Sequence, residues 1–513
     1  MKITRRDFVK ITGFSALSMG FQFPTAWGKF SLPRTSPESQ GVLSSGILDF
    51  LKAIKESGLE WHSFMLVRHG NVVAEGWWKP FDASYKHTLY SLSKSFTSSA
   101  IGFLVTEGKI TVEDPVLKYF PQDAPAAPSE YLKAMKIKHL LTMNTGHEKE
   151  ANLRASTDTW VKTFLHHEVK FEPGTHFLYN TPATYMLGAI IHKVTGQTLD
   201  EYLKPRLFTP LSIEGYDWEK SPQGLNTAGY GLRVKTEDIA RFGQLYLQKG
   251  QWQGKQILPE VWINEATNKQ TTSQTGDNDW SQGYGYQFWR CKPGFYRGDG
   301  AFGQFCMVMP EYDAVLAMTC ESFNLQKSMN VAYDTILHAF KSTPQTESPS
   351  VWATLRAEIA VLSLPVVKSK TSSTLMSKYS DKVFKVEKNE YGLQRIGFGL
   401  FADAGVMRVD YDGKGFHKIG FGWEQWKVSK NSEKNPFPVA NRTHVPSKIA
   451  ATGTWINENT LQINLKFVEA VHGDKLTVVF EGDNVTVRFL NSIAENQKNT
   501  PDNREILRGV MVV

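Results

Sequence analysis

A serine and a lysine stand three residues apart in Ser91-Leu92-Ser93-Lys94, the one Ser-x-x-Lys of the chain. Apolar residues recur every three or four positions from residue 91 until Gly108, which predicts a helix beginning at the serine. Residues three apart share a helical face, so the amine of Lys94 can take the proton of the Ser91 hydroxyl if burial lowers its pKa. The helix N-terminus would also favour developing negative charge. The plainer interpretation is that Ser91 caps the helix and Lys94 is solvated.

Two further segments carry groups suited to the same chemistry. Tyr179 follows Pro173-Gly174-Thr175-His176-Phe177-Leu178 and precedes a helical run. A tyrosine near a lysine can relay protons, since a cationic neighbour favours the phenolate, although a lone tyrosine commonly packs a loop onto the core. The segment Gly298-Asp299-Gly300-Ala301-Phe302-Gly303-Gln304 leads into an apolar strand. Its glycines would let a substrate approach the backbone, or would form a hairpin turn.

The pattern of the remaining chain predicts the elements that position these segments. Residues 63–78 read as a β-hairpin, residues 183–195 and 236–248 as helices, and residues 283–320 as further strands. Strands at both ends with helices between them predict an α/β (α+β) layered domain built on an antiparallel sheet. We assign residues 29–341 to this domain.

The C-terminal part has a different character. Residues 342–377 contain polar, proline-containing stretches, and we interpret them as a linker. Short alternating runs separated by turn signals then predict a separate all-β domain over residues 378–513.

Bulk composition narrows the functional class. The chain has 513 residues, 41% apolar and 21% charged, which is typical of globular proteins. A net charge of +7 without long basic runs argues against nucleic acid as a partner. Three scattered cysteines and the lack of a metal-binding motif indicate neither a disulfide framework nor a metal site. We therefore expect no cofactor.

Residues 1–28 are interpreted as a targeting signal. Paired arginines, Arg5 and Arg6, precede a mildly apolar stretch that is too short for a confident membrane span. This pattern is typical of a twin-arginine signal peptide, and it predicts a periplasmic or secreted protein without a membrane span after cleavage. The alternative is a basic amphipathic helix that stays attached.

The three chemical segments, in this order, resemble those of the beta-lactamase-related serine hydrolases. That family includes class C beta-lactamases, D-alanyl-D-alanine carboxypeptidases, esterases and 6-aminohexanoate-dimer hydrolases. The similarity extends over about residues 35–340 and includes Ile137-Lys138-His139-Leu140-Leu141-Thr142 and Gly229-Tyr230-Gly231-Leu232. It implies a serine beta-lactamase/penicillin-binding-protein-like antiparallel sheet flanked by helices. The C-terminal domain resembles the lipocalin-like appendages of some members.

The resemblance also implies roles for individual residues. Ser91 would be the acylated nucleophile, Lys94 and Tyr179 the general-base pair, and the backbone N–H groups of Ser91 and Ala301 the oxyanion hole. The expected reaction is cleavage of a small-molecule ester or amide through an acyl-enzyme.

Two departures from the family pattern bear on the substrate. The triplet that usually begins with a cation is Gly298-Asp299-Gly300 here, and Arg297 would partly compensate. The second motif reads Tyr179-Asn180-Thr181, so Thr181 takes the usual asparagine position. We expect substrate contacts from these segments, at Thr181, Arg297, Gly298, Gly300 and Gln304. A class C-like beta-lactamase, a D-Ala peptidase, or a non-catalytic binding relative are the alternatives. The sequence does not indicate an oligomeric state.

Overall fold

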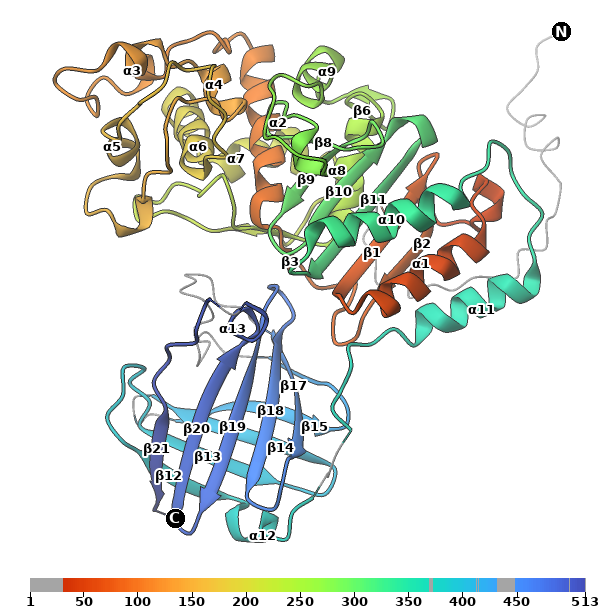
Figure 1. The fold of residues 1–513 in the computed structure, drawn as a ribbon, viewed down its shortest axis with the longest axis vertical. Coiled ribbons are helices and arrows are strands. Elements are labelled where there is room, and N and C mark those ends of the chain that lie inside the picture. Colours follow the sequence, from red (N-terminus) through yellow and green to blue (C-terminus); the bar gives the residue numbers. More distant parts are fainter. Residues whose placement is uncertain are drawn as a thin grey trace, which may run out of the picture. The chain divides into compact units, whose positions relative to one another are not determined.

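The computed structural model describes residues 31–368, 372–411, 413, 415–430, 448–497 and 499–512. The predicted targeting signal lies outside the described residues. Leu32–Val513 forms one compact unit, in which a layered α/β domain is followed by an all-β domain (Figure 1).

A six-stranded antiparallel sheet forms the centre of the first domain, as predicted. Its strand order is β2-β1-β11-β10-β9-β8. The strands are β1 (Glu60–Arg68), β2 (Asn71–Trp77), β8 (Trp289–Arg290), β9 (Tyr296–Gly300), β10 (Gln304–Met309) and β11 (Ala314–Glu321). The first strand in the sequence, β1, lies inside this sheet, where it pairs with β2 on one side and with β11, the last strand of the domain, on the other.

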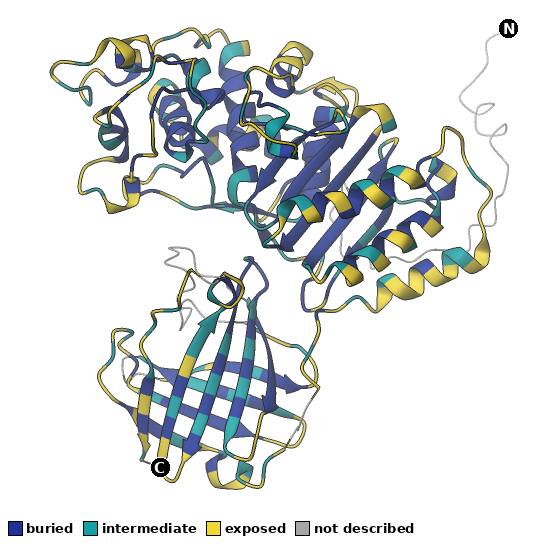
Figure 2. Ribbon diagram, in the orientation of Figure 1, coloured by how far each residue is buried: buried dark blue, intermediate teal, exposed yellow. Residues whose placement is uncertain are grey.

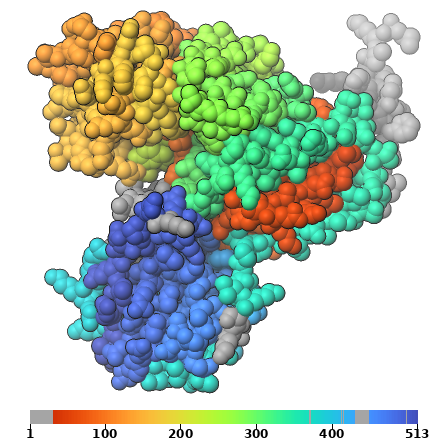
Figure 3. All heavy atoms as spheres, viewed as in Figure 1, coloured from red at the N-terminus to blue at the C-terminus, as the bar shows by residue number. Residues whose placement is uncertain are grey.

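Helices cover both faces of the sheet because its side chains alternate between two apolar cores. Phe64 and Leu66 of β1 join the core beneath α1 (Ser44–Ser57) and α10 (Leu325–Ala339). Met65 and Val67 join the core that contains α8 (Thr236–Leu247). The strands are dark blue in Figure 2, while α1 and α10 turn exposed faces outward. Figure 3 shows these two helices side by side at the surface.

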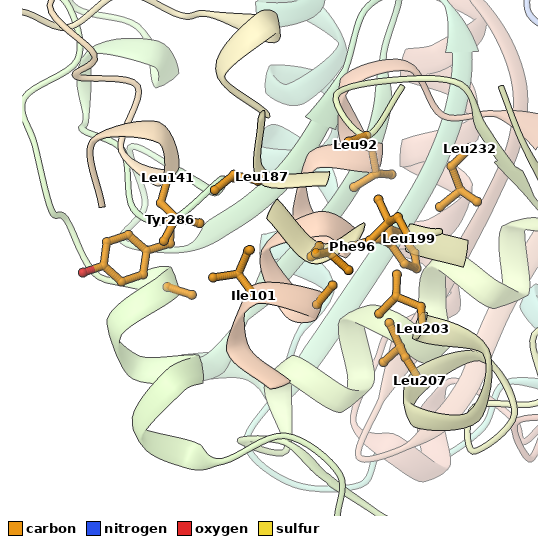
Figure 4. Close-up of a cluster of buried hydrophobic side chains, with 14 of the residues drawn as sticks. Leu92, Phe96, Ile101, Leu141, Leu187, Leu199, Leu203, Leu207, Leu232 and Tyr286 are labelled. Atoms are coloured by element: carbon orange, nitrogen blue, oxygen red, sulfur yellow. The ribbon is translucent and has the colours of Figure 1, made fainter. Parts of the chain in front are cut away.

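A helical region surrounds α2 (Ser93–Thr106), which is buried over almost its whole length. A short 3-10 turn, Tyr90–Leu92, leads into it. The apolar cluster around α2 includes Phe96, Ile101 and Leu187, which come from α2 and α6 (Thr181–Thr195) (Figure 4). The remaining helices of the domain are α3 (Glu130–Ala134), α4 (Ile137–Leu141), α5 (Trp160–Leu165), α7 (Leu199–Leu203) and α9 (Glu260–Thr267). Small sheets are formed by β3 (His87–Thr88), β4 (Asp217–Trp218) and β5 (Leu232–Val234), and by β6 (Gln251–Trp252) with β7 (Lys255–Gln256).

The stretch interpreted as a linker contains a helix, α11 (Pro349–Ala360). Leu355 of this helix is fully buried in the core that α1 and α10 share. The residues before this helix are polar, so the stretch is interpreted as a linker from its sequence. Its apolar residues Val351, Leu355 and Ile359 are nevertheless four residues apart and share one helical face. Part of the expected linker is therefore packed against the first domain.

The all-β prediction for the C-terminal domain is confirmed. Nine strands close into a barrel through a short parallel pairing of β15 with β17. They are β12 (Lys382–Val386), β13 (Arg395–Leu400), β14 (Ala404–Asp410), β15 (His417–Trp423), β17 (Lys448–Trp455), β18 (Thr460–Phe467), β19 (Gly473–Glu481), β20 (Asn484–Asn491) and β21 (Leu507–Met511). β16 (Lys427–Lys430) pairs with β17, and α12 (Met376–Tyr379) and α13 (Ser492–Asn496) complete the domain. Its interior holds a separate apolar core.

Within the described residues, no helix combines the length and the apolar character needed to cross a membrane.

Candidate active site

Ser91 lies in the 3-10 turn between β3 and α2, at the edge of the central sheet. Two bonds to β5 hold this turn in place: Leu89 N donates to Leu232 O at 2.9 Å, and Leu232 N donates to the Ser93 hydroxyl at 3.2 Å. Tyr90 has a φ of +50°, a left-handed conformation that is strained for a bulky residue and marks functional sites. The first turn of α2 has no side-chain cap, so the capping interpretation of Ser91 is wrong.

Lys94 is almost completely buried, with 1% of its surface exposed, so its interpretation as a solvated residue is also wrong. Its Nζ lies 3.1 Å from Ser91 Oγ, 3.3 Å from Thr181 Oγ1 and 2.8 Å from the carbonyl oxygen of Gly229. Burial lowers the pKa of the Lys94 amine to about 7. A neutral amine has two N–H donors and one lone pair. Donation to Gly229 and Thr181 leaves the lone pair for the Ser91 hydroxyl.

Tyr179 closes the other side of the serine. Its hydroxyl is close to the Ser91 side chain, and its ring lies 4.9 Å from Lys94 Nζ. The ring stacks on Trp289 with centroids 5.4 Å apart, which fixes its direction. Burial raises the pKa of the phenol above its usual value. The expectation that the neighbouring cation favours a phenolate is therefore wrong, because burial keeps the Tyr179 phenol protonated.

The one-residue displacement in the second motif has a structural explanation. Asn180 is buried and caps α6, because its side chain accepts from Ala183 N at 3.2 Å. Thr181, the next residue, is the one whose Oγ1 lies 3.3 Å from Lys94 Nζ. The carboxylate of Glu150 accepts from Thr181 N and fixes the start of this helix.

The third motif forms a tight hairpin against the serine turn. A Cβ on Gly300 would lie 2.1 Å from Leu89 O, and one on Gly298 would lie 2.4 Å from Leu92 Cδ1. Both glycines are therefore required by the close approach of β9 to the serine turn. Ala301 begins the turn between β9 and β10, where Gly303 N donates to Gly300 O at 3.1 Å.

The side chains of Gln304 and Arg297 are buried and bond to groups inside the protein. The Gln304 amide donates to Ala301 O at 3.1 Å and to Cys320 O at 2.7 Å, which braces the hairpin turn. The Arg297 guanidinium is completely buried and paired with Asp299 at 3.0 Å. It lies 4.8 Å from the ring centroid of Trp280, so it is not exposed to a substrate carboxylate. The structure places both residues behind the site.

A cavity of about 350 Å³ borders the site at Thr181, while Ser91, Lys94 and Tyr179 are not among its lining residues. Thr181 forms part of its wall, together with the aromatic residues Trp160, Tyr185 and Tyr230. Glu150 and Arg154 supply charge at its border, and Arg154 is paired with Glu219 at 2.8 Å. The walls are thus mainly apolar and aromatic, which suits a small organic group.

Two contributors were not singled out in the sequence. Gly229 offers its carbonyl to Lys94, and Glu150 holds Thr181. Gly229 is within the Gly229-Tyr230-Gly231-Leu232 stretch that carries the family resemblance. Its residue type does not predict that its backbone carbonyl contacts Lys94. A Cβ there would lie 2.8 Å from Thr181 Cγ2, which explains the glycine.

The fold and this arrangement define a protein of the beta-lactamase class, and the chain belongs to that family. The family model named Beta-lactamase matches residues 56–341, more than half of the chain. The chain is a serine hydrolase of this family.

Known relatives span several activities. A 6-aminohexanoate-dimer hydrolase of Paenarthrobacter ureafaciens is 24% identical over 329 residues, covering 58% of this chain and 82% of that protein. A beta-lactamase of Escherichia coli K12 is 25% identical over 222 residues, covering 39% and 55%. The crystal structure of a putative beta-lactamase from Bacteroides dorei matches with a TM-score of 0.50 at 16% identity, covering 58% of this chain and 99% of that one. This last likeness concerns the fold.

Proposed function

We propose that this protein is an exported hydrolase that cleaves an ester or a small amide through an acyl-enzyme on Ser91. The observation that carries the proposal is the buried Lys94 amine, whose pKa is lowered to about 7 and whose Nζ lies 3.1 Å from Ser91 Oγ. A general base whose pKa is close to the working pH is efficient at proton transfer.

Acylation follows from these positions. The Ser91 oxygen attacks the substrate carbonyl carbon while its proton passes to Lys94. The C–O or C–N bond then breaks, and the leaving group takes a proton from the Tyr179 phenol. Lys94 returns its proton to Tyr179, so the net transfer is from the serine to the leaving group. In the second half of the cycle water attacks the acyl carbon while the neutral Lys94 amine accepts its proton. The bond to Ser91 Oγ then breaks, and Lys94 returns the proton to the serine oxygen as the carboxylic acid leaves.

The backbone N–H groups of Ser91 and Ala301 are the proposed oxyanion hole. The contact between Gly300 and Leu89 brings β9 against the serine turn and so supports this role for Ala301. Donors fixed in advance where charge develops stabilise the tetrahedral intermediate. Gln304 helps to fix this geometry by bonding to Ala301 O.

The substrate proposal rests on charge. Arg297 is buried and paired with Asp299, so an anionic substrate such as a penicillin has no matching cation in this segment. An ester or a linear amide fits better, and one relative, 24% identical to this chain, is named as a 6-aminohexanoate-dimer hydrolase. Beta-lactam and D-Ala peptide hydrolysis rank below it.

Labelling with a fluorophosphonate probe, followed by peptide mass spectrometry, tests the nucleophile. We expect a covalent adduct on Ser91 in wild type and none in Ser91→Ala. Ser45→Ala, at an exposed position of α1, is the control and should label as the wild type does. Rates on short acyl esters, linear amide dimers, nitrocefin and D-Ala peptides then rank the substrates. A folded protein that neither labels nor turns over any of them would be a binding relative.

Export is proposed from the twin-arginine pattern of residues 1–28. Fractionation of cells that express the full chain should place the mature protein outside the cytoplasm, and Arg5→Lys/Arg6→Lys should retain it inside. Equal export of both would contradict the signal.

A further inference from the structure

The C-terminal barrel reaches the serine turn through the connection between β18 and β19, residues 468–472. This connection is buried: Val468 is 0%, Val471 1% and His472 2% exposed. Val468 and Ala450 of the barrel belong to the same apolar core as Phe64 and Leu66 of the central sheet. The barrel and the hydrolase domain therefore share an apolar interior at this point.

A chain of three side chains runs from the central sheet through the barrel to the serine turn. Glu321, at the end of β11, accepts from His472 Nδ1 at 2.6 Å. His472 Nε2 lies 2.6 Å from the hydroxyl of Tyr90. A carboxylate only accepts hydrogen bonds, so Nδ1 carries the proton. In the neutral imidazole Nε2 then accepts from the Tyr90 hydroxyl.

Charged partners hold Glu321 in the ionised state. Lys466 of β18 lies 2.9 Å from Glu321 and is also paired with Glu60 of β1. Burial alone would raise the pKa of Glu321, but Lys466, His472 and the Ser492 hydroxyl together hold it well below its usual range. The carboxylate is thus a fixed acceptor for His472.

The same charges argue against a metal ion in this place. Glu60, His62 and Glu321 offer ligand atoms within 4.8 Å of one another. The Lys466 ammonium bonds to both carboxylates and already supplies the positive charge. The cluster therefore links the two domains through ion pairs.

The imidazole also contacts Phe302, the residue that follows Ala301 of the proposed oxyanion hole. Its ring meets the ring of Phe302 edge-on, with centroids 4.6 Å apart, and Phe302 lies 5.4 Å from the Tyr90 ring. Tyr90 precedes Ser91, and Phe302 follows Ala301. Tyr90 and Phe302 both have left-handed φ angles, +50° and +65°. Such strained residues persist when their surroundings hold them in place.

We propose that His472 of the barrel is a positioning residue for the hydrolase site, which holds Tyr90 and Phe302 and thereby sets the spacing of the Ser91 and Ala301 backbone N–H groups. The barrel is thus a functional part of the enzyme. The catalytic meaning of this inference rests on the proposed function of Ser91, whereas the positioning itself does not.

Three variants of the full chain test it. Tyr90→Phe and His472→Phe each remove the hydrogen bond, and the second keeps a ring against Phe302. We expect each to lower kcat on a p-nitrophenyl ester about tenfold, in line with the loss of one buried hydrogen bond, and to leave KM within about twofold. His472→Phe also removes the bond to Glu321. The double variant should therefore be no worse than His472→Phe alone, because that change has already removed the bond to Tyr90. His417→Phe, on β15, is the matched control and should retain wild-type rates.

Amide hydrogen exchange measures the positioning without relying on catalysis. In both single variants, exchange should accelerate about tenfold in peptides covering residues 88–95 and 298–304, and should stay unchanged in α6. Unchanged exchange in both segments, or fully additive losses of kcat, would overturn the proposal. If wild type neither labels at Ser91 nor hydrolyses esters, the proposed function fails, and the exchange result still decides the role of His472.

Discussion

The amine of Lys94 lies 2.8 Å from the carbonyl oxygen of Gly229, and this contact organises the proposed proton transfer. A carbonyl accepts an N–H bond from either protonation state of the amine, so it fixes the position of Nζ throughout a catalytic cycle. With Thr181 as the second acceptor, the free lone pair of the neutral amine is directed to Ser91. Four predictions follow from this and related contacts.

The rate should rise with pH through about 7. Since burial lowers the pKa of Lys94 to about 7, the amine is charged and inactive as a base below that pH and neutral above it. The kcat/KM profile for a neutral ester should therefore show an ascending limb near pH 7. Lys94→Arg, which stays protonated, should lose about 10³-fold or more at every pH. A flat wild-type profile between pH 5.5 and 8.5 would refute the base assignment.

Tyr179→Phe should damage catalysis according to the leaving group. The phenylalanine keeps the stacking on Trp289 and loses the proton donor. We expect losses of about 10²-fold or more on amides and alkyl esters, whose leaving groups need a proton. The loss on a p-nitrophenyl ester should be much smaller, because p-nitrophenolate leaves without one. Equal losses on both substrates would show that Tyr179 does not act as the acid.

Gly300→Ala should separate β9 from the serine turn. The added methyl would lie 2.1 Å from Leu89 O, a backbone atom that cannot rotate away. We expect a loss of about 1–3 kcal/mol in the free energy of unfolding, measured with denaturant, together with a large fall in kcat. Gly294→Ala is the control, since a Cβ there meets open space and only its positive φ is unfavourable. The control should retain most of the activity.

Arg297→Gln should lower the free energy of unfolding and should not change the preference between neutral and anionic substrates. The buried guanidinium is paired with Asp299, and breaking such a pair leaves an uncompensated charge, at a cost of about 3–5 kcal/mol. Among esters that differ only in a distal carboxylate, the ratio of KM values should not change. A selective rise in KM for the anionic ester would return Arg297 to the substrate site.

Many of the helices and strands could be predicted from the sequence, because they follow from local patterns of apolar residues. The hairpin around His69-Gly70 and the helices that became α6 and α8 follow from period-two and period-3.6 patterns. The separate β domain was visible from its alternating strands. Helix α11 was not predicted, because three apolar residues in a polar stretch are a weak helical signal. The packing of Leu355 against α1, which stabilises the helix, is a tertiary contact.

What the sequence by itself determined is the order of the chemical groups: Ser91 with Lys94 one helical turn away, then Tyr179, then the glycine-rich hairpin. Tertiary structure decided how these groups behave. Burial lowers the pKa of Lys94 and raises that of Tyr179, and it encloses the Arg297 guanidinium in the protein interior. It also brings His472 within 2.6 Å of Tyr90 across a separation of 382 residues. Neither desolvation nor so distant a contact leaves a local pattern, because both depend on which surfaces the folded chain brings together.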